Sequence, residues 1–285
     1  MSLLPQLIDT IELERLDELE FRGNSLFIGS PRVYGGQVIA QILHAANQTV
    51  PLDRWLHSFH GYFLSPGDVE KPIRFEVEKI KDGRSFSSRR ILAKQGDRTI
   101  FLSSASYHIF EDGVSHQQSM PNVAQPESLS SFSELFQQFA EKSKVKPRGI
   151  FSEESPIIFH PVEHYDPFNP GIKPPLNHTW FKLNGNASSD IRVQKTLLAY
   201  MSDFNLLITS LMPHDMSMFT TPVNLASLDH AMWFHRPFDM NEWMLYVVEC
   251  PSAGNARGFC TGKIFTRTGD LVASVTQEGL IRIIE

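Results

Sequence analysis

The fold is decided by the stretch GGQVIAQILHAANQTV (35–50) and the nearby segment HSFHGYFL (57–64). Apolar residues of the first stretch recur at i, i+3, i+4 and i+7, which predicts a helix with one apolar face: Ile39, Ile42, Leu43 and Ala46. Pro51 closes this helix because proline cannot continue its hydrogen bonds. From residue 57 the apolar period changes from 3.6 to 2, which predicts a strand.

Around this stretch the first half contains further strand-like segments. Alternating or β-rich runs separated by short polar turns predict three more strands: Ile73–Ile80, Ser85–Ala93 and Thr99–Phe110. Before them, Leu3 to Leu19 has apolar residues near helical spacing and predicts an amphipathic helix. A helix followed by a meander of antiparallel strands is an α+β layout and not βαβ winding.

The second half repeats this order. A helix over Ile191–Met212 precedes four predicted strands: Ala226–His235, Met244–Cys250, Ala256–Thr266 and Leu271–Arg282. The order and the turns recur at a separation of roughly 170 residues, which indicates an internal duplication. Between the halves, a segment rich in Gln, Ser and Pro has weak periodicity and one short helix near Ser131–Lys142.

A single helix wrapped by an antiparallel sheet is the hot-dog arrangement. The predicted fold class is therefore α+β, a double hot-dog with two tandem repeats that share an extended antiparallel sheet around central helices. We expect the first repeat at 1–115, the connecting segment at 116–175 and the second repeat at 176–285.

Composition narrows the partners and the compartment. The 285 residues carry a net charge of −6, which gives no reason to expect nucleic acid as a partner. The two cysteines, Cys250 and Cys260, are too few for a disulfide framework and indicate a reducing compartment. The N-terminal residues lack the features of a signal peptide, and no apolar run reaches 18 residues, so we expect a cytoplasmic protein without a membrane span.

Several catalytic motifs are absent from the sequence. It has no Gly-x-Ser-x-Gly elbow, phosphate loop or dinucleotide fingerprint, which disfavours serine hydrolases of the α/β type and nucleotide-binding enzymes. The pairs His57 and His60, and His230 and His235, come without carboxylates at matching spacing. We therefore expect no metal and no cofactor.

Five blocks of the sequence resemble the type II acyl-CoA thioesterases: RVYGGQV (32–38), HSFHGYFLSPGD (57–68), DFN (203–205), LDHAMWFHRPF (228–238) and ASVTQEG (273–279). The resemblance spans nearly the whole chain apart from the connecting segment. It implies a double hot-dog fold and a catalytic trio in the second half, which falls on Asp203, Ser227 and Gln277. Threonine occurs in the family at the position of Ser227. Serine keeps the hydroxyl group of that threonine, so the same hydrogen bonds are expected.

The chemistry of the trio suits thioester hydrolysis. Asp203 would act as general base on a water that attacks the acyl-CoA carbonyl, and Ser227 and Gln277 would hold that water. The neighbours of Asp203 are mostly apolar, so its carboxylate is expected to be partly buried. Backbone N–H groups at a helix start would stabilise the oxyanion. The N–H groups of Gly35 to Gln37 are expected to play this part at a second pseudo-site, which is the position in the other repeat that corresponds to the active site. We do not count these residues as catalytic.

Substrate contacts are expected next to this trio. The acyl tail should lie between helix 191–212 and the strand from Ala226, against Met232, Trp233 and Phe234. The phosphates of CoA should meet Arg236, Arg257 and Lys263 at the surface, or else the first-half cations around Arg84, Arg89 and Arg90.

Two other functions remain open at this point. A hydratase-like hot-dog enzyme would need His230 or His235 beside Asp203, and a non-catalytic acyl-CoA binding protein would fit asparagine at position 203 better than aspartate. The family resemblance also implies self-association, as a homodimer or homotetramer, since an exposed sheet edge needs cover.

Overall fold

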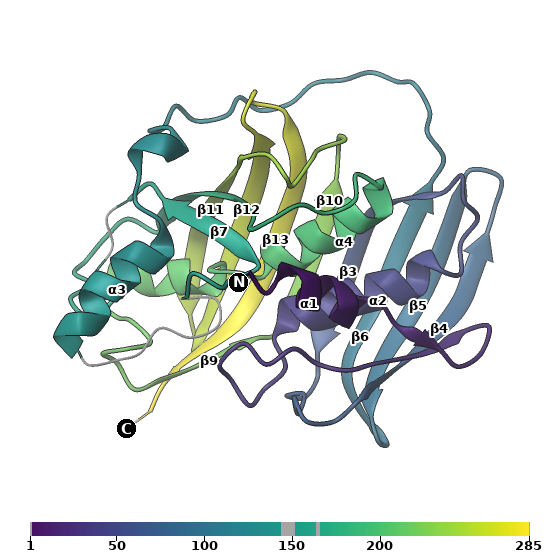
Figure 1. The fold of residues 1–285 in the computed structure, drawn as a ribbon, viewed down its shortest axis with the longest axis horizontal. Coiled ribbons are helices and arrows are strands. Elements are labelled where there is room, and N and C mark those ends of the chain that lie inside the picture. The colour runs from purple at the N-terminus through teal and green to yellow at the C-terminus, as the bar shows by residue number, and fades with distance from the viewer. Residues whose placement is uncertain (1, 144–151, 164–165, 285) are drawn as a thin grey trace.

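The computed structural model describes residues 2–143, 152–163 and 166–284. Within these ranges the strands form one antiparallel sheet in the order β1-β2-β4-β5-β6-β3-β10-β13-β12-β11-β8-β7, and β9 pairs with β13. The helices α1, α2 and α4 lie on one face of this sheet (Figure 1). The predicted double hot-dog fold is confirmed.

The first half begins with helix α1 (Leu4–Ile11) and the short strands β1 (Glu14–Arg15) and β2 (Glu20–Gly23). Central helix α2 (Gly35–Asn47) is followed by β3 (Trp55–Phe63), β4 (Ile73–Asp82), β5 (Phe86–Gln95) and β6 (Arg98–His108). The predicted helix over Leu3–Leu19 was therefore too long. Residues beyond Ile11 form a hairpin instead, because Phe21 pairs with Phe75 of β4 and is buried there.

The connecting segment contains a 3-10 turn η1 (Pro126–Ser128), helix α3 (Phe132–Ser143) and strand β7 (Ile157–Pro161). The second half follows with β8 (Leu176–Leu183), α4 (Ile191–Ser202), the 3-10 helix η3 (Leu207–His214), β9 (Val223–Ser227), β10 (Asp229–Phe234), β11 (Met244–Gly254), β12 (Arg257–Thr266) and β13 (Leu271–Ile283). Strand β7 pairs with β8, so part of the predicted connection extends the sheet of the second repeat.

The two repeats meet at the centre of the sheet. Strands β3 and β10 pair there in an antiparallel register that sets Met232 opposite Phe59. Over this seam the central helices α2 and α4 pack against each other. Both side chains of the register pair are fully buried and belong to one core that runs through the two repeats. The repeats therefore share a single hydrophobic interior.

The other face of the sheet is partly covered in the second repeat. There the connecting segment crosses Trp180, Val247 and Phe265, which are buried beneath it together with Leu245. The indole Nε1 of Trp180 donates a hydrogen bond to the carbonyl oxygen of Ala124 at 2.8 Å. Figure 1 shows this segment passing along the top of the molecule from β6 towards α3.

The predicted helix 191–212 is interrupted after Ser202. Asp203 is the C-cap of α4, and Asn205 adopts a left-handed φ of 58°, a conformation that asparagine tolerates better than most residues. The chain then restarts as η3. This break places Asp203 at the end of a buried helix, next to the sheet.

Candidate active site

Asp203 is the centre of a buried hydrogen-bond cluster. Its side chain is 6% exposed. Gln277 donates from Nε2 to Asp203 Oδ1 at 2.7 Å, and Ser227 donates from Oγ to the same oxygen at 3.3 Å. The backbone N–H of Gly36 donates to Oδ2 at 3.0 Å. The three residues predicted from the sequence therefore lie in contact.

Strand pairing explains how Ser227 and Gln277 reach this carboxylate. Ser227 at the end of β9 pairs with Gly279 of β13, two residues beyond Gln277. Because side chains alternate along a strand, Gln277 and Gly279 both face the helices. Leu207 of η3 fills the space where a side chain at position 279 would sit, with its Cδ2 at 2.5 Å from that point. Glycine is thus required for η3 to pack close to the site.

Gly35 and Gly36 come from the first repeat but belong to this site. A Cβ atom on Gly35 would lie 2.6 Å from Asp203 Oδ2, and one on Gly36 would lie 2.2 Å from the carbonyl oxygen of Tyr200. Only glycine allows this approach. The expectation that this helix start serves a second pseudo-site was wrong, because α2 and α4 are antiparallel and the start of one meets the end of the other.

Opposing effects set the proton affinity of Asp203. Burial raises its pKa from the ordinary value of 3.8 to about 6, while the hydrogen bonds from Gln277, Gly36 and Ser227 act in the opposite direction. Desolvation is the larger effect, because the charged carboxylate loses more hydration free energy on burial than the three hydrogen bonds restore. A carboxyl group that titrates near pH 6 is suited to take a proton from water in neutral solution.

His230 is a titratable side chain close to Asp203 that the sequence left outside the trio. It is fully buried, and its Nδ1 lies 4.0 Å from Asp203 Oδ1. Its Nε2 lies 2.9 Å from Ser202 Oγ, which donates its own proton to the carbonyl oxygen of Ala199. Nε2 therefore carries the proton. Burial lowers the pKa of His230 to about 3, so the pair with Asp203 is not a salt bridge.

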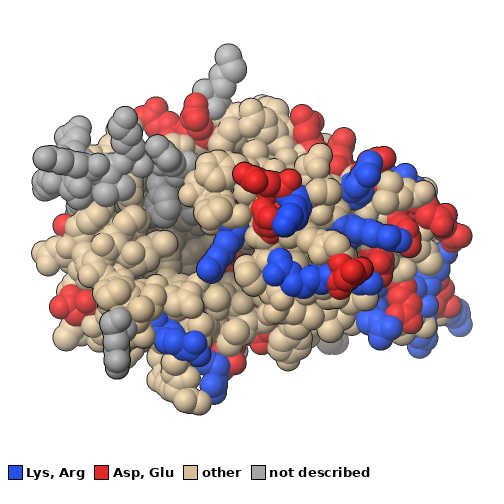
Figure 2. Space-filling view, turned by 90° about the horizontal axis from the view of Figure 1, so that it is seen from below, with Lys and Arg blue, Asp and Glu red and all other residues tan. Residues whose placement is uncertain are grey.

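A cavity of about 330 Å³ adjoins the cluster. It is lined by Gly35 and Ser227, by Arg32 towards the surface, and by the apolar side chains Val33, Val38, Phe63, Leu64, Pro66, Ile100, Phe101, Leu225, Ala226 and Leu228. Figure 2 shows the molecule from below, where the surface is hollowed and Lys or Arg side chains stand beside the hollow. An elongated ligand with one charged end suits such a cavity.

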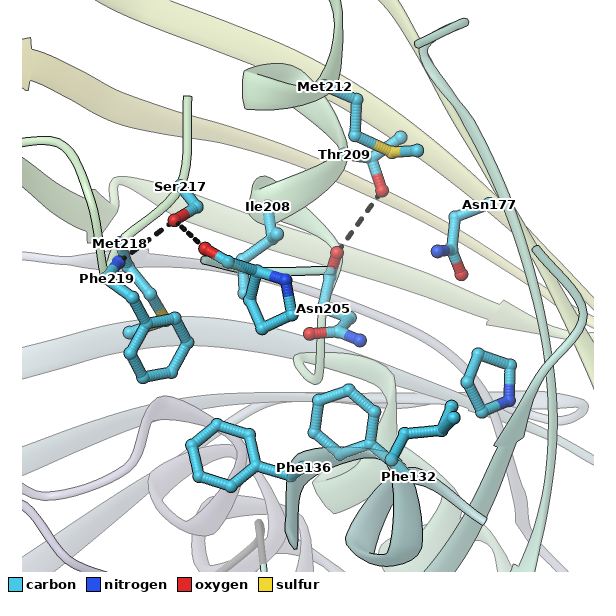
Figure 3. Close-up of a pocket in the computed structure, with 13 residues that line it drawn as sticks. Phe132, Phe136, Asn177, Asn205, Ile208, Thr209, Met212, Ser217, Met218 and Phe219 are labelled. Atoms are coloured by element: carbon cyan, nitrogen blue, oxygen red, sulfur yellow. Dashed lines mark hydrogen bonds between the residues drawn. The ribbon is translucent and has the colours of Figure 1, made fainter. Parts of the chain in front are cut away.

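A second, narrower pocket lies on the other side of the helix break. Figure 3 shows Phe132 and Phe136 of α3 facing Ile208 and Met212 of η3, with Asn205 between them. The cavity volume is about 50 Å³, and its lining is mostly apolar. Asn205 follows Asp203 by two residues, so this pocket begins close to the carboxylate.

The predicted substrate-binding residues lie apart from these two pockets. Met232 and Phe234 are buried in the shared core, and Trp233 points to the opposite face of the sheet, where it contacts His60. The cations also have partners. Arg257 pairs with Glu278 at 2.9 Å, and Lys263 lies 3.9 Å from Glu249. Arg236 donates to the carbonyl oxygen of Leu271, to Ser115 at the end of the first repeat and to His116 at the start of the connecting segment.

Fold and site together define a class: a double hot-dog protein with one buried carboxylate cluster at the junction of its repeats. Comparison with known proteins identifies the family. Residues 27–108 match the acyl-CoA thioesterase N-terminal domain model and residues 148–280 match the acyl-CoA thioesterase model. The chain belongs to the acyl-CoA thioesterase family, so the predicted family and enzyme class, an acyl-CoA thioester hydrolase, are confirmed.

Individual relatives agree over the full length. The chain is 42% identical to acyl-CoA thioesterase 2 of Haemophilus influenzae, with 100% of this chain and 99% of the relative covered. It is 35% identical to human acyl-coenzyme A thioesterase 8, with 96% and 88% covered. The solved acyl-CoA thioesterase II from Mycobacterium marinum superposes with a TM-score of 0.81 at 36% identity, covering 98% of this chain and 99% of that one.

Among the described residues, no helix is both long and apolar enough to cross a membrane. Nor do three or more His, Cys, Asp or Glu side chains gather closely enough in those ranges to hold a metal ion.

Proposed function

We propose that the chain hydrolyses fatty acyl-CoA to a free fatty acid and CoA, by direct attack of a water that Asp203 activates. The observation that carries this proposal is the buried carboxylate with a pKa raised to about 6 and held by three donors. The test is thiol release from acyl-CoAs of graded chain length. A folded protein that releases no thiol from any of them would contradict the proposal.

Each partner of Asp203 has a role in this reaction. Gln277 and Ser227 fix Oδ1 so that the carboxylate faces the attacking water in one orientation. The amino end of α2 carries a partial positive charge, which favours the negative charge that develops on the thioester oxygen. Since Gly36 N–H is already engaged by Asp203, the neighbouring Gly35, which lines the cavity, is the better position for an oxyanion contact.

The 330 Å³ cavity is the proposed site for the pantetheine arm of CoA. Its lining is mainly apolar, and it extends from Ser227 to Arg32. Arg98 lies nearby and donates to the carbonyl oxygen of Pro66 in the same wall. Neither arginine has an ion-pair partner within the described ranges, so both can meet phosphate groups.

Arg236, Arg257 and Lys263 stay alternative predictions for the phosphates. Their existing contacts argue against them, because binding CoA would first require those contacts to break. Charge reversal separates the two sets. Arg32→Glu should raise KM for acyl-CoA several-fold with kcat little changed, and Arg257→Glu should leave both unchanged. The opposite result would favour the second-half cations.

The acyl tail is proposed to enter the narrow pocket between α3 and η3. The apolar lining of this pocket and its start beside Asn205 support this position for the tail. Contact of the tail with Met232, Trp233 and Phe234 stays a less supported prediction, because Met232 and Phe234 are buried in the core. With a volume of about 50 Å³ the pocket admits little of a long tail unless its walls shift. Met212→Ala, which widens it, should move the preferred chain length upwards.

One observation favours a second candidate function. His230 lies 4.0 Å from Asp203, the arrangement that a hydratase-like hot-dog enzyme would need. Addition of water to an enoyl-CoA by this pair would be visible as loss of absorbance from crotonyl-CoA. Because Nδ1 of His230 carries no proton and its pKa is about 3, it cannot serve as the general acid of such a reaction at neutral pH, so hydrolysis is the better supported function.

We also propose a homodimer or homotetramer in the cytoplasm. Both edges of the described sheet are short, with two residues in β1 and five in β7, so the edges are poor interfaces. The uncovered outer face is the better surface: Tyr62 is 58% and Phe259 40% exposed. Light scattering should report a multiple of the 32.4 kDa chain, and Tyr62→Lys should weaken the assembly. The two free, buried cysteines support a reducing compartment, which cell fractionation can test.

A further inference from the structure

The last turn of α4 directly precedes Asp203, which is the C-cap of this helix. A helix leaves its last four carbonyl oxygens without partners inside the helix, and in α4 these oxygens belong to residues 199–202. Their partial negative charge opposes the ionisation of a carboxylate placed at the helix end. The groups that satisfy these four oxygens therefore affect the catalytic base.

Two of the four oxygens are satisfied locally. Ser202 Oγ donates to the carbonyl oxygen of Ala199 at 2.9 Å, and the backbone N–H of Phe204 donates to that of Met201 at 2.8 Å. Both donors lie within three residues of their acceptors, so these contacts form whenever the helix ends here.

The other two oxygens accept hydrogen bonds from tyrosines on distant parts of the chain. Tyr34, just before α2, donates to the carbonyl oxygen of Tyr200 at 3.1 Å. Tyr246 of β11 donates to the carbonyl oxygen of Ser202 at 2.8 Å. This second carbonyl belongs to the peptide bond that joins Ser202 to Asp203, so Tyr246 holds the backbone immediately before the carboxylate.

The sheet fixes the position of Tyr246. Its neighbours in register are Thr179 of β8 and Ile264 of β12, and its side chain is buried. A Cβ atom on Gly262 would lie 2.5 Å from the ring carbon Cε2 of Tyr246 and 2.8 Å from its hydroxyl oxygen, so this glycine leaves the space that the ring occupies. Tyr246 lines neither of the two pockets beside Asp203 and is therefore out of contact with the proposed substrate positions.

The corresponding end of α2 is satisfied by a charged donor instead. Arg192 donates to the carbonyl oxygen of Asn47, the last residue of α2, at 2.9 Å, and the C-cap that follows is Gln48, which cannot act as a base. A guanidinium in the same position beside Asp203 would lower the pKa of that carboxyl group. A phenol supplies the hydrogen bond without the charge, so a tyrosine suits the end of α4, where the base is.

We propose that Tyr246 is a positioning residue for thioester hydrolysis, which acts through the carbonyl group of Ser202 to hold Asp203 in line with its donors and to limit the negative field at its carboxylate. This inference rests on the proposed function. Loss of the Tyr246 hydroxyl would leave the Ser202 carbonyl buried without its donor. The negative end of that carbonyl would then act unopposed on Asp203, and ionisation of the base would become harder.

Ionisation of Asp203 can be followed without interference from its surroundings. The titratable side chains near it on the elements packed around it are Tyr34 before α2, Tyr200 on α4, His230 on β10, Tyr246 on β11 and Cys260 on β12. Burial raises the pKa of the three tyrosines and lowers that of His230, while a hydrogen bond with Cys250 and burial raise that of Cys260. All five are uncharged between pH 5 and 8, so a change of charge at the cluster in this range belongs to Asp203.

Tyr246→Phe tests the inference, because phenylalanine keeps the ring beside Gly262 and removes only the hydroxyl. We expect kcat for thiol release to fall on the order of tenfold, since a small misplacement of a reacting group is costly. KM for acyl-CoA should stay unchanged. The midpoint of the rise of kcat/KM with pH should move upwards by roughly half a unit to one unit, the size expected for an unopposed helix end in a buried site.

Tyr107→Phe is the matched control. Tyr107 of β6 is equally buried, but its hydroxyl has no hydrogen-bond partner among the described residues, so its loss should change neither kcat nor the pH profile. Titration of the Asp203 carboxyl carbon by ¹³C NMR, with the signal identified by its loss in Asp203→Asn, measures the pKa without turnover. It therefore separates this inference from the proposed function, which absence of thiol release in the wild type would refute by itself. An unchanged pKa of Asp203 or an unchanged kcat in Tyr246→Phe, or an equal change in Tyr107→Phe, would overturn the inference.

Discussion

Replacement of Asp203 by asparagine tests the chemistry and the electrostatics of the site together. Asparagine keeps the shape and still accepts hydrogen bonds from Gln277 and Ser227, but it cannot take a proton from water. Loss of a general base typically costs about 10²–10⁴-fold in rate. We therefore expect kcat for thiol release to fall by roughly that factor, with KM for acyl-CoA little changed.

The same change has a stability signature that depends on pH. Burial raises the pKa of Asp203 from 3.8 to about 6, a difference of roughly two units, and each unit corresponds to about 1.4 kcal/mol. A raised carboxyl pKa stabilises the fold below pH 3.8, and this contribution is lost as pH rises through 6. The wild type thus loses up to about 3 kcal/mol between these limits, and Asp203→Asn does not.

The variant also carries a cost that is independent of pH. Its amide nitrogen would face the N–H of Gly36, and one lost buried hydrogen bond costs about 1–3 kcal/mol. Urea unfolding at pH 4.5 and 7.5 should therefore show the variant less stable than the wild type at the lower pH and about equal at the higher. Asp97→Asn, at an exposed turn position, is the control. Wild-type turnover, or a stability difference that does not change with pH, would refute the reasoning.

Four further outcomes are expected. The rate kcat/KM should rise with pH through about 6 as Asp203 ionises, and a profile flat from pH 5 to 8 would contradict this. Gln277→Ala and Ser227→Ala should each lower kcat less than Asp203→Asn, since solvent can replace either donor in part; loss of all activity in either would give that residue a larger role. Dialysis against a strong chelator should leave thiol release unchanged, whereas recovery on adding zinc or magnesium would reveal a metal. Rising ionic strength should raise KM for acyl-CoA with kcat nearly constant, an effect that Arg32→Glu should diminish.

Sequence periodicity was enough for most of the fold. The change from a period of 3.6 to a period of 2 after Pro51 predicted α2 and β3, and the same change predicted their counterparts in the second half. The periodicity gave a wrong prediction where strand pairing outweighs the local helical preference of the sequence. Residues 12–23 contain acids and spaced apolar residues that fit a helix, yet Phe21 is buried against β4 and draws the segment into the sheet.

The site was predictable only where family motifs lie within it. Asp203 and Gln277 stand in blocks that resemble relatives, and Ser227 directly precedes such a block, but the contact between Gly36 and Asp203 joins residues 167 positions apart and leaves no local trace. The helix break did leave a signal. Asn205 can adopt a left-handed conformation that ends a helix, and the sequence DFN could have indicated that α4 stops there. Cavities and free cations depend on packing, which explains why Arg32 was not considered.

The hydrogen bond from Gly36 to Asp203 makes the two copies of this duplicated chain inseparable. After a duplication, the repeat that lacks the catalytic residue is commonly free to change in sequence. Here the first repeat, which has no catalytic base, supplies the Gly36 N–H that orients Asp203 of the second repeat. Separately produced first and second repeats should each be inactive and regain activity only on reassociation. Substitutions at Gly35 and Gly36 should therefore be as poorly tolerated as those at Asp203, although no base lies in their half of the chain.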